Sequence, residues 1–304
     1  MNIEGSQWNH SPEGRYHWAF RNESGKWIQK GLLEFPIRCC YPCISLKNRR
    51  VDIIAVSDID EPNTEWMSYK REYAGIAWDY DFRQLYMTFS LDISQHGLVK
   101  PILIDSVDDT AGHIKHLDIH VDDESITHVL YIVKNICKPF MRDRFFRGET
   151  ITATLKVVQI KNGKVISDLI IAVCHEEADG KLWSYGKPVG EKNTGDSFRT
   201  NELVPLHGAI HATPHGRLFV IYTLGGYDIN GVDLAENYIV EITDGIKTDP
   251  VKLSLQNPMK TFFTSPVRIG ATPSHWIDMF GIGKNTPNQI NYGRIFIQYG
   301  HNSG

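Results

Sequence analysis

Three histidines stand within eight positions of the stretch GHIKHLDIHVD, at residues 113–123, and could bind a metal ion or move protons. Polar and apolar residues alternate along this stretch, which is typical of a β-strand with one apolar face. On a strand that rises about 3.3 Å per residue, His116 and His120 stand about 13 Å apart. Zinc holds its nitrogen ligands at about 2.0–2.1 Å, so these two histidines do not share one ion. We therefore expect no metal site here, and we expect His113 and His116 to bind a ligand or move protons instead.

Nearly every periodic segment of the chain has the two-residue period of a strand, and four stretches are copies of one pattern. Each copy is a strand entered by a polar residue, a polar turn and a very apolar strand, and the first three copies are followed by a further hairpin. Such a unit is a four-stranded antiparallel meander, and units of this kind around an axis make a β-propeller. The copies are YPCISLKNRRVDIIAVSD (41–58), HLDIHVDDESITHVLYIVK (116–134), HGAIHATPHGRLFVIYT (207–223) and TSPVRIGATPSHWIDMFG (264–281).

We therefore predict an all-β fold, a single β-propeller domain over residues 1–304 with five blades of four antiparallel strands. The N-terminal hairpin of HWAFR (17–21) and WIQKGLL (27–33) resembles the outer half of a blade whose inner half is missing. The strands then fall short of the about twenty that five closed blades need. We expect the N-terminal blade to be incomplete, or the two ends of the chain to complete one blade together.

The four copies predict a ring of polar side chains around the propeller axis, because their first residues would stand at equivalent places on the innermost strands. Histidine, tyrosine and arginine in such a ring suit a polar or anionic small ligand. The alternative is that these side chains fill the channel and bond to one another. The ring positions are Tyr41, His116, His207 and Thr264, with Arg38, His113, His211 and Arg268 close to them in the sequence.

A long insertion, residues 57–83, interrupts the first full unit between its second and third strands, and its residues 62–78 could hold a short helix. Long ordered loops of this kind often carry function. The insertion is rich in aromatic rings, which stack on a sugar, and in charged groups, which bond its hydroxyls. The alternative is a cover over the edge of the blade. Its candidate residues are Asp58, Glu61, Asp79, Trp66, Trp78 and Arg71.

The bulk composition is that of an ordinary globular protein, with 304 residues, 41% hydrophobic and 22% charged. A net charge of −4 gives no electrostatic reason to expect nucleic acid as a partner. We expect no transmembrane helix, because no run of about 18 apolar residues appears. The polar N-terminus, MNIEGSQWNHSPEGR, lacks the apolar core of a secretory signal, so we expect a cytoplasmic protein or a secreted one whose leader is absent.

The five cysteines are odd in number and irregular in spacing, which argues against a disulfide framework. The stretch CCYPC has no second Cys/His pair at zinc spacing. We expect these cysteines to be small buried side chains.

Two short stretches resemble the Asp-box of sialidase-like, BNR-repeat propellers, a superfamily that acts on carbohydrates. They are NESGKW (22–27) and ADGKLW (178–183), each looser than the S-x-D-x-G-x-T-W pattern. The three-arginine cluster of sialidases is not recognisable, so the resemblance implies the blade architecture and not sialidase catalysis.

The ring of His, Tyr and Arg looks more similar to that of propeller-shaped uronate lyases. That resemblance implies a base that removes the proton next to the uronate carboxylate, a cation that offsets the carboxylate charge, and an acid for the leaving oxygen. Histidine suits the role of the base because its pKa lies near neutral pH. The resemblance implies His116 and His207 as bases, Tyr41 as the acid, and Arg38 or Arg268 as the carboxylate partner.

We predict a carbohydrate-active enzyme that acts on an acidic poly- or oligosaccharide by β-elimination or by glycoside hydrolysis. A hydrolase would use two carboxylates about 5–10 Å apart. Asp58 and Glu61 are candidates, with Asp79 as a third. The alternative is a non-catalytic propeller that binds a glycan or a protein. We expect no cofactor, and a structural calcium ion on the axis is left open.

Overall fold

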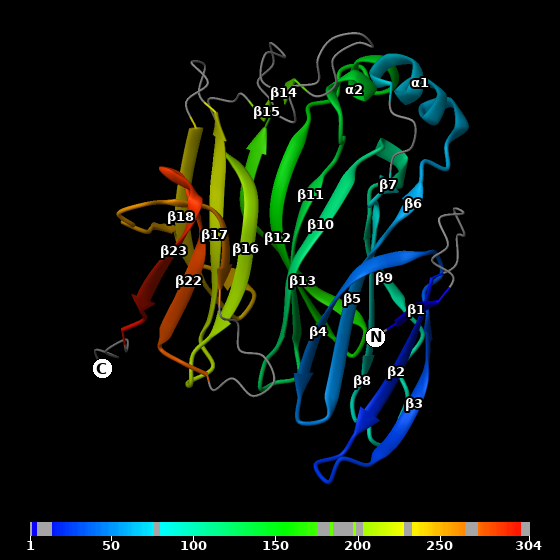
Figure 1. Cartoon of the computed structure of the whole chain (residues 1–304), viewed down its shortest axis with the longest axis vertical. Coiled ribbons are helices and arrows are strands. Elements are labelled where there is room, and N and C mark those ends of the chain that lie inside the picture. The colour runs from blue at the N-terminus through cyan, green and yellow to red at the C-terminus, as the bar shows by residue number, and fades with distance from the viewer. Residues whose placement is uncertain are drawn as a thin grey trace.

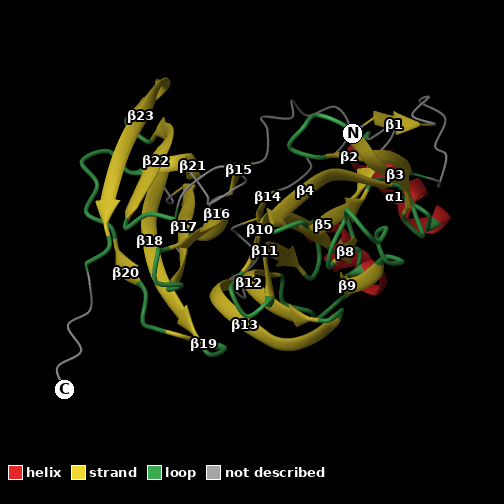
Figure 2. Ribbon diagram, turned by 90° about the horizontal axis from the view of Figure 1, so that it is seen from below, coloured by secondary structure: helices red, strands yellow, loops and turns green. Residues whose placement is uncertain are grey.

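A computed structural model describes residues 2–4, 14–75, 80–175, 183–184, 197–198, 203–227, 233–264 and 273–298. Within these ranges the chain forms five main antiparallel sheets that follow one another in sequence order (Figure 1). Seen from below, the sheets form an arc, with one strand of each sheet at the concave side (Figure 2). The predicted all-β propeller of antiparallel blades is confirmed.

The two sheets in the middle of the chain, the second and the third, have the predicted four strands, and the others have three or five. The first sheet joins β1 (Asn2–Glu4), β2 (Arg15–Arg21) and β3 (Trp27–Glu34), and the second joins β4 (Cys39–Lys47), β5 (Arg50–Ser57), β8 (Gln84–Ser90) and β9 (Ile102–Ser106). The third joins β10 (His113–Val121), β11 (Thr127–Lys134), β12 (Thr152–Lys161) and β13 (Lys164–His175). The fourth joins β16 (Val204–Ala212), β17 (Leu218–Tyr227), β18 (Asp233–Thr243) and β19 (Ile246–Lys247), with β20 (Val251–Lys252) on β18, and the fifth joins β21 (Met259–Thr264), β22 (Trp276–Gly283) and β23 (Thr286–Phe296).

Helices and two short ribbons cap one end of the sheets, at the top of Figure 1. Helix α1 begins where the Asn63 side chain accepts hydrogen bonds from the next turn, and it ends at Gly75, whose φ of 63° suits glycine. This helix confirms the short helix expected in the 57–83 insertion. The elements are α1 (Thr64–Ala74), α2 (Pro139–Phe145), the 3₁₀ turn η1 (Asp108–Thr110), the ribbon β6 (Ile59–Asp60)–β7 (Tyr80–Asp81) and the ribbon β14 (Trp183–Ser184)–β15 (Ser197–Phe198).

The very apolar second strands are buried because each sheet packs on the next one. Ile54 of β5, Val129 of β11 and Val220 of β17 are all 0% exposed. Separate apolar clusters join the first sheet to the second, the second to the third, the third to the fourth and the fourth to the fifth. In the described part of the chain no such cluster joins the fifth sheet to the first, and the two lie at opposite ends of the arc (Figure 2).

The innermost strands of the second to fifth sheets each carry a β-bulge, and the bulges correct the predicted alignment of the ring. The register shifts between Cys40 and Cys43, between His116 and Asp118, between Pro205 and His207, and between Met259 and Thr261. Tyr41 therefore lies inside its bulge, His116 directly before its bulge and His207 directly after its bulge, whereas Thr264 is the last residue of β21. The alignment failed here because a bulge adds residues to one strand of a pair without a signal in the apolar pattern.

All five cysteines are free thiols, and three of them, Cys39, Cys40 and Cys174, are buried as expected, while Cys43 and Cys137 are half-buried. Among the described residues no helix is both long enough and apolar enough to span a bilayer.

Candidate functional site

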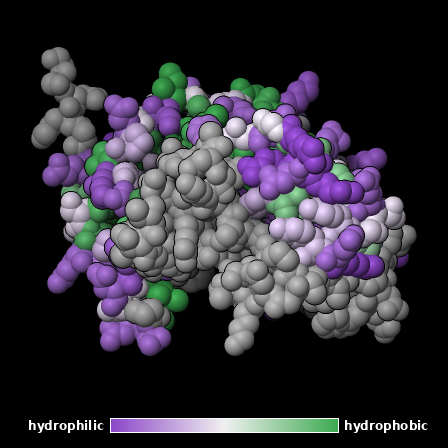
Figure 3. All heavy atoms as spheres, turned by 90° about the horizontal axis from the view of Figure 1, so that it is seen from above, coloured by the Kyte–Doolittle hydropathy of each residue, from purple (hydrophilic) through white to green (hydrophobic). Residues whose placement is uncertain are grey.

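The first half of each innermost strand lies at the end of the sheets that carries the helices. Because β11 runs up into α2 and β5 runs up towards α1, their antiparallel partners β10 and β4 begin at that end (Figure 1). Seen from there, the described surface is mostly hydrophilic with scattered apolar residues (Figure 3). The predicted ring residues Tyr41, His116 and His207 belong to this end, which we call the helix end.

His116 is tied to the neighbouring sheet through one ring nitrogen. Its Nε2 lies 2.5 Å from the backbone carbonyl oxygen of Tyr41, which can only accept, so Nε2 carries the hydrogen. Burial lowers the pKa of His116 below its ordinary value, and the nearby Lys115 acts in the same direction, although the bond to Tyr41 opposes them. His116 is therefore a neutral imidazole whose Nδ1 is the nitrogen with a lone pair.

Tyr41 presents its side chain to solvent beside this histidine. The residue has a φ of 51° inside the bulge of β4, and it is 69% exposed. Its ring lies 6.1 Å from that of Phe82, which in turn lies 5.5 Å from the ring of His113 in an edge-on arrangement. The bulge thus turns a tyrosine hydroxyl outwards at the helix end, where it can reach a ligand.

Lys115 bridges from the third sheet to the fourth and was not singled out from the sequence. Its Nζ donates a hydrogen bond of 2.9 Å to the backbone oxygen of Leu206, on the residue before His207. The side chain is open to water, yet desolvation by the surrounding protein lowers its pKa, and Lys134 adds to that effect. The alternation along β10 places Lys115 and His116 on opposite sides of the strand, so Lys115 faces the fourth sheet and His116 the second.

His207 lies next to this ammonium group and stays neutral. Burial lowers its pKa to about 4, and the positive charge of Lys115 contributes. Its ring makes no hydrogen bond to any residue in the described ranges, and its side chain is half-buried. The helix end therefore holds the ammonium group of Lys115 between two neutral imidazoles. One is His116, the next residue on β10, and the other is His207 on β16 of the fourth sheet.

Arg38 and Asp58 form an ion pair at the start of β4. An Nη2 to Oδ2 distance of 2.9 Å joins them, and the Asp58 amide also donates to the Arg38 carbonyl at 2.9 Å. The side chain of Arg38 is 26% exposed and that of Asp58 only 11%. The guanidinium group is thus shared with a protein carboxylate and is not wholly available to a ligand.

Glu61 lies in a buried network of charges that fixes α1 to the second sheet. Its carboxylate accepts from Lys70 of α1 at 2.7 Å and from both terminal nitrogens of Arg83, one of them at 3.0 Å. Arg83 also lies 3.0 Å from Asp81. Burial alone would raise the pKa of Glu61, but the bonds and charges of Arg83 and Lys70 outweigh it and hold the pKa below its ordinary value.

The aromatic residues of the insertion pack on α2. The ring of Trp66 lies 5.6 Å from that of Phe146, and the guanidinium of Arg83 lies 5.2 Å from the centroid of the Trp66 ring. Tyr73 stacks on Phe140 at 4.8 Å. The described part of the insertion thus packs against α2 at the helix end, as the alternative of a structural cover requires.

Of the remaining predicted site residues, the two that the structure describes, His211 and Arg71, do not join Tyr41, Lys115, His116 and His207. His211 is 2% exposed, bonds through Nε2 to the Ser274 carbonyl at 2.7 Å, and lies four residues beyond His207, about 13 Å along the strand. Arg71 is exposed on the last turn of α1. Trp78, Asp79 and Arg268 lie outside the described residues, as do residues 178–182 of the second Asp-box-like stretch.

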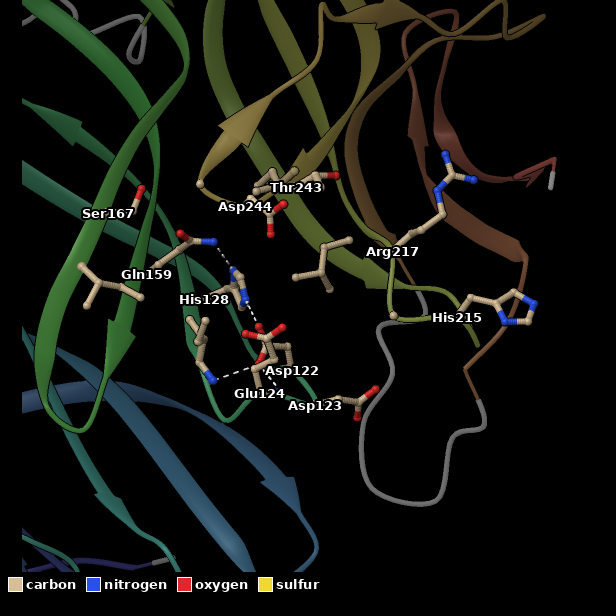
Figure 4. A pocket seen from close by; sticks show the side chains of 16 residues that line it. Asp122, Asp123, Glu124, His128, Gln159, Ser167, His215, Arg217, Thr243 and Asp244 are labelled. Atoms are coloured by element: carbon tan, nitrogen blue, oxygen red, sulfur yellow. Dashed lines mark hydrogen bonds and ion pairs between the residues drawn. The ribbon is translucent and has the colours of Figure 1, made fainter. Parts of the chain in front are cut away.

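A polar cavity of about 670 Å³ opens at the opposite end, between the third and fourth sheets (Figure 4). His128 lies at its centre, 2.8 Å from Asp122 through Nε2 and 3.4 Å from the Gln159 amide through Nδ1. Burial alone would raise the pKa of Asp122, but the bond to His128 and two backbone amides outweigh it and hold the pKa below its ordinary value. No group of three or more His, Cys, Asp or Glu side chains in the described ranges is placed to hold a metal ion. The sequence showed this region only as turns.

Neither a family model nor a curated protein matches the chain. Three solved structures to which it is similar are a protein of unknown function from Dyadobacter fermentans, a puromycin-hydrolyzing peptidase from Mycobacterium tuberculosis and an α-L-arabinofuranosidase from Podospora anserina. The identities are 13%, 11% and 9%, over 84%, 94% and 85% of this chain, with TM-scores of 0.40, 0.33 and 0.26. The chain spans 65%, 44% and 90% of those three chains, so it covers less than two thirds of the first two. Likeness of this degree assigns no activity.

Proposed function

We propose that the chain is a carbohydrate-active enzyme that cleaves a uronate-containing poly- or oligosaccharide by β-elimination at the helix end. The observation that carries this proposal is Lys115, an accessible ammonium group held beside the neutral His207 by its bond to the Leu206 carbonyl. An ammonium group binds the uronate carboxylate, and a neutral imidazole accepts the proton on the adjacent carbon.

The reaction balances with groups of this chain. His207 takes the proton from the carbon next to the carboxylate, a carbon–carbon double bond forms, and the bond to the glycosidic oxygen breaks. The Tyr41 hydroxyl gives a proton to that leaving oxygen. Lys115 stabilises the negative charge that gathers on the carboxylate as the proton leaves. His116 acts as a positioning residue, because its Nε2 holds the backbone of Tyr41.

The low pKa of His207 is compatible with this role because the substrate changes it. In the free protein burial is the main cause of the low His207 pKa of about 4, and the charge of Lys115 adds to it. A bound carboxylate would neutralise that charge and raise the pKa of His207 towards working pH, where a general base is most effective. The base would thus gain strength only when the acidic sugar is in place.

Elimination is favoured over hydrolysis by the state of the two candidate carboxylates. A glycosidase needs a carboxylic acid whose pKa is raised. Glu61 is instead buried against Arg83 and Lys70 with a lowered pKa, and Asp58 is paired with Arg38. The two carboxylates already serve as ion-pair partners.

The alternative function is a non-catalytic glycan-binding propeller. The low pKa of His207 favours it, because an imidazole that stays neutral and is a weak base can simply form hydrogen bonds with sugar hydroxyl groups.

An assay on a panel of uronate-containing and neutral polysaccharides separates the two functions. One channel follows the ultraviolet absorbance of a new conjugated double bond, and the other follows reducing ends. We expect absorbance with wild-type protein and at least a 100-fold loss in His207→Gln, with His96→Gln as the matched control because His96 is exposed elsewhere. Reducing ends without absorbance would contradict elimination, and binding of the polymer without either signal would establish the binding function.

A further inference from the structure

The outer face of the fifth sheet is strongly apolar and exposed. Side chains on β22 and β23 pair across this face in four rows, and three of the rows are apolar on both strands. Ile277 and Met279, which alternate with them on β22, lie on the other face of the sheet and are fully buried against the fourth sheet. The exposed fractions are Trp276 46%, Phe296 42%, Phe280 42%, Tyr292 63%, Ile282 42% and Ile290 79%.

This face continues the series of interfaces that builds the fold. Each sheet before it is covered by the next one through an apolar cluster, from the first sheet to the fifth. The fifth sheet has such a cluster on one face only in the described part of the chain. A monomer rarely exposes an apolar patch of several hundred square ångströms without an interaction partner.

The outer face of the first sheet is not complementary to it. That face carries the Arg15–Glu34 ion pair at 2.9 Å, Arg21 at 5.5 Å over the Trp27 ring, and Lys30. Burying those charges under the apolar face of the fifth sheet would strip them of water without new partners. The charges therefore disfavour a head-to-tail contact between copies of the chain.

The face of the fifth sheet is complementary to itself. Its one polar row is Asp278 and Arg294, 2.6 Å apart, and Tyr292 donates a hydrogen bond to the same carboxylate. The charges on the face thus cancel within one copy, and the apolar rows on both sides of that pair can pack on their own twofold-related equivalents.

The area is sufficient for a stable dimer. A fully buried aromatic side chain covers about 150–250 Å², and the six apolar residues still expose roughly half of their surface. Each copy would contribute about 600 Å² from these residues, or about 1,200 Å² for two copies, which is at the lower end of specific interfaces before any rim residue is counted.

We propose that the chain forms an isologous dimer in which the outer faces of the two fifth sheets pack against each other. The symmetry closes the assembly at two copies, because both apolar faces are used. The helix end stays accessible in this arrangement, since the interface lies at the end of the arc.

The test is the mass in solution, measured by light scattering after gel filtration at tens of micromolar. We expect twice 34.6 kDa for the wild-type chain. The double variant Ile282→Arg/Ile290→Arg, which places charges on opposite strands of the face, should elute at 34.6 kDa. The matched control is Ile246→Arg/Val251→Arg, at residues 70% and 60% exposed on the fourth sheet, and it should remain a dimer.

Ile290→Ser is the milder variant in case the double variant does not fold, and it should weaken dimerisation at least tenfold. A wild-type mass of 34.6 kDa would overturn the proposal, and so would a dimer that survives both face variants. Wild-type species larger than two copies would show a head-to-tail contact and contradict the closed symmetry. A monomer that sediments with insoluble polysaccharide, and loses this in Ile282→Arg/Ile290→Arg, would identify a glycan as the occupant instead.

Discussion

Replacing Glu61 by glutamine tests whether this carboxylate is structural or catalytic. Glu61 is 2% exposed, and its partners Arg83 and Lys70 are 2% and 4% exposed. The substitution leaves two buried cations with Asp81 as the nearest carboxylate. Removing one member of a buried ion pair costs about 3–5 kcal/mol, because the remaining charge has lost its water and its partner. We expect a loss of that size in the free energy of unfolding, from urea denaturation.

Two further variants show whether the loss comes from the buried charge. Glu61→Gln/Lys70→Met removes one of the two cations as well and should recover part of the loss. Asp123→Asn breaks the Lys47–Asp123 pair, whose aspartate side chain is 83% exposed, and should change the stability by less than about 1 kcal/mol. If Glu61→Gln unfolds within about 1 kcal/mol of wild type yet loses production of reducing ends, the structural role is refuted and the hydrolase is favoured.

Three further predictions concern single residues. By NMR titration, His207 should stay neutral down to about pH 4 in the free protein, and an added uronate oligosaccharide should raise its pKa; a free-state pKa near 6.5 would contradict the account. Thr127→Val should cost about 1–3 kcal/mol by urea unfolding, because the fully buried Thr127 hydroxyl lies 2.8 Å from Asp52 and 3.0 Å from Arg50 at the junction of two sheets, and an unchanged midpoint would contradict this. Gly112→Ala should cost about 1–3 kcal/mol by the same measurement, because an added Cβ would lie 2.4 Å from the Lys134 carbonyl oxygen. Gly25→Ala is the comparison: its added Cβ would meet nothing within 4 Å, so any loss there comes only from the positive φ of 83°.

The pH dependence of stability follows from two pKa shifts in the same direction, one of a carboxylate and one of an imidazole. The pKa of Glu61 is lowered in the folded state, so its contribution is present above the ordinary value of 4.5 and is lost as the pH falls towards the lower folded value. The pKa of His207 is also lowered, from 6.5 to about 4, so for both groups the unfolded chain binds the proton first as the pH falls. Its contribution is therefore present above pH 6.5 and is lost between pH 6.5 and about 4. Both effects predict that the protein loses stability on the acid side.

The blade pattern could be predicted from the sequence because burial on both faces leaves a direct trace. Strands such as β5 and β11 are buried at nearly every position and carry an unbroken apolar run, since a sheet covers each face, and the repeat of that run identifies the blades. The short helix α1 could also be expected, because Asn63 is a good cap and Gly75 a good stop.

The site was only partly predictable, for reasons that particular residues make clear. Tyr41, His116 and His207 do belong to the helix end, but the bulges shift their places on the strands. Lys115 could not be singled out from the sequence, because a single lysine in a strand normally indicates a solvent-facing charge. Only the bond to the Leu206 carbonyl distinguishes it. The sequence suggests Glu61 as a catalytic carboxylate and Trp66 as a substrate-binding ring, but their partners Lys70, Arg83 and Phe146 come from other elements and cannot be inferred from spacing.

The most direct test of the proposed function is the appearance of a conjugated double bond in uronate polysaccharides, compared between wild type and Lys115→Met. Lys115 is the residue that the structure adds to the predicted ring. The proposed elimination needs it to bind the uronate carboxylate, whereas a hydrolase that used Asp58 and Glu61 would not need it. We predict rising ultraviolet absorbance with wild type and its loss by at least 100-fold in Lys115→Met, with Lys30→Met, an exposed lysine on the first sheet, unchanged. Absorbance that persists in Lys115→Met would contradict the account, as would reducing ends released by wild type with no absorbance at all.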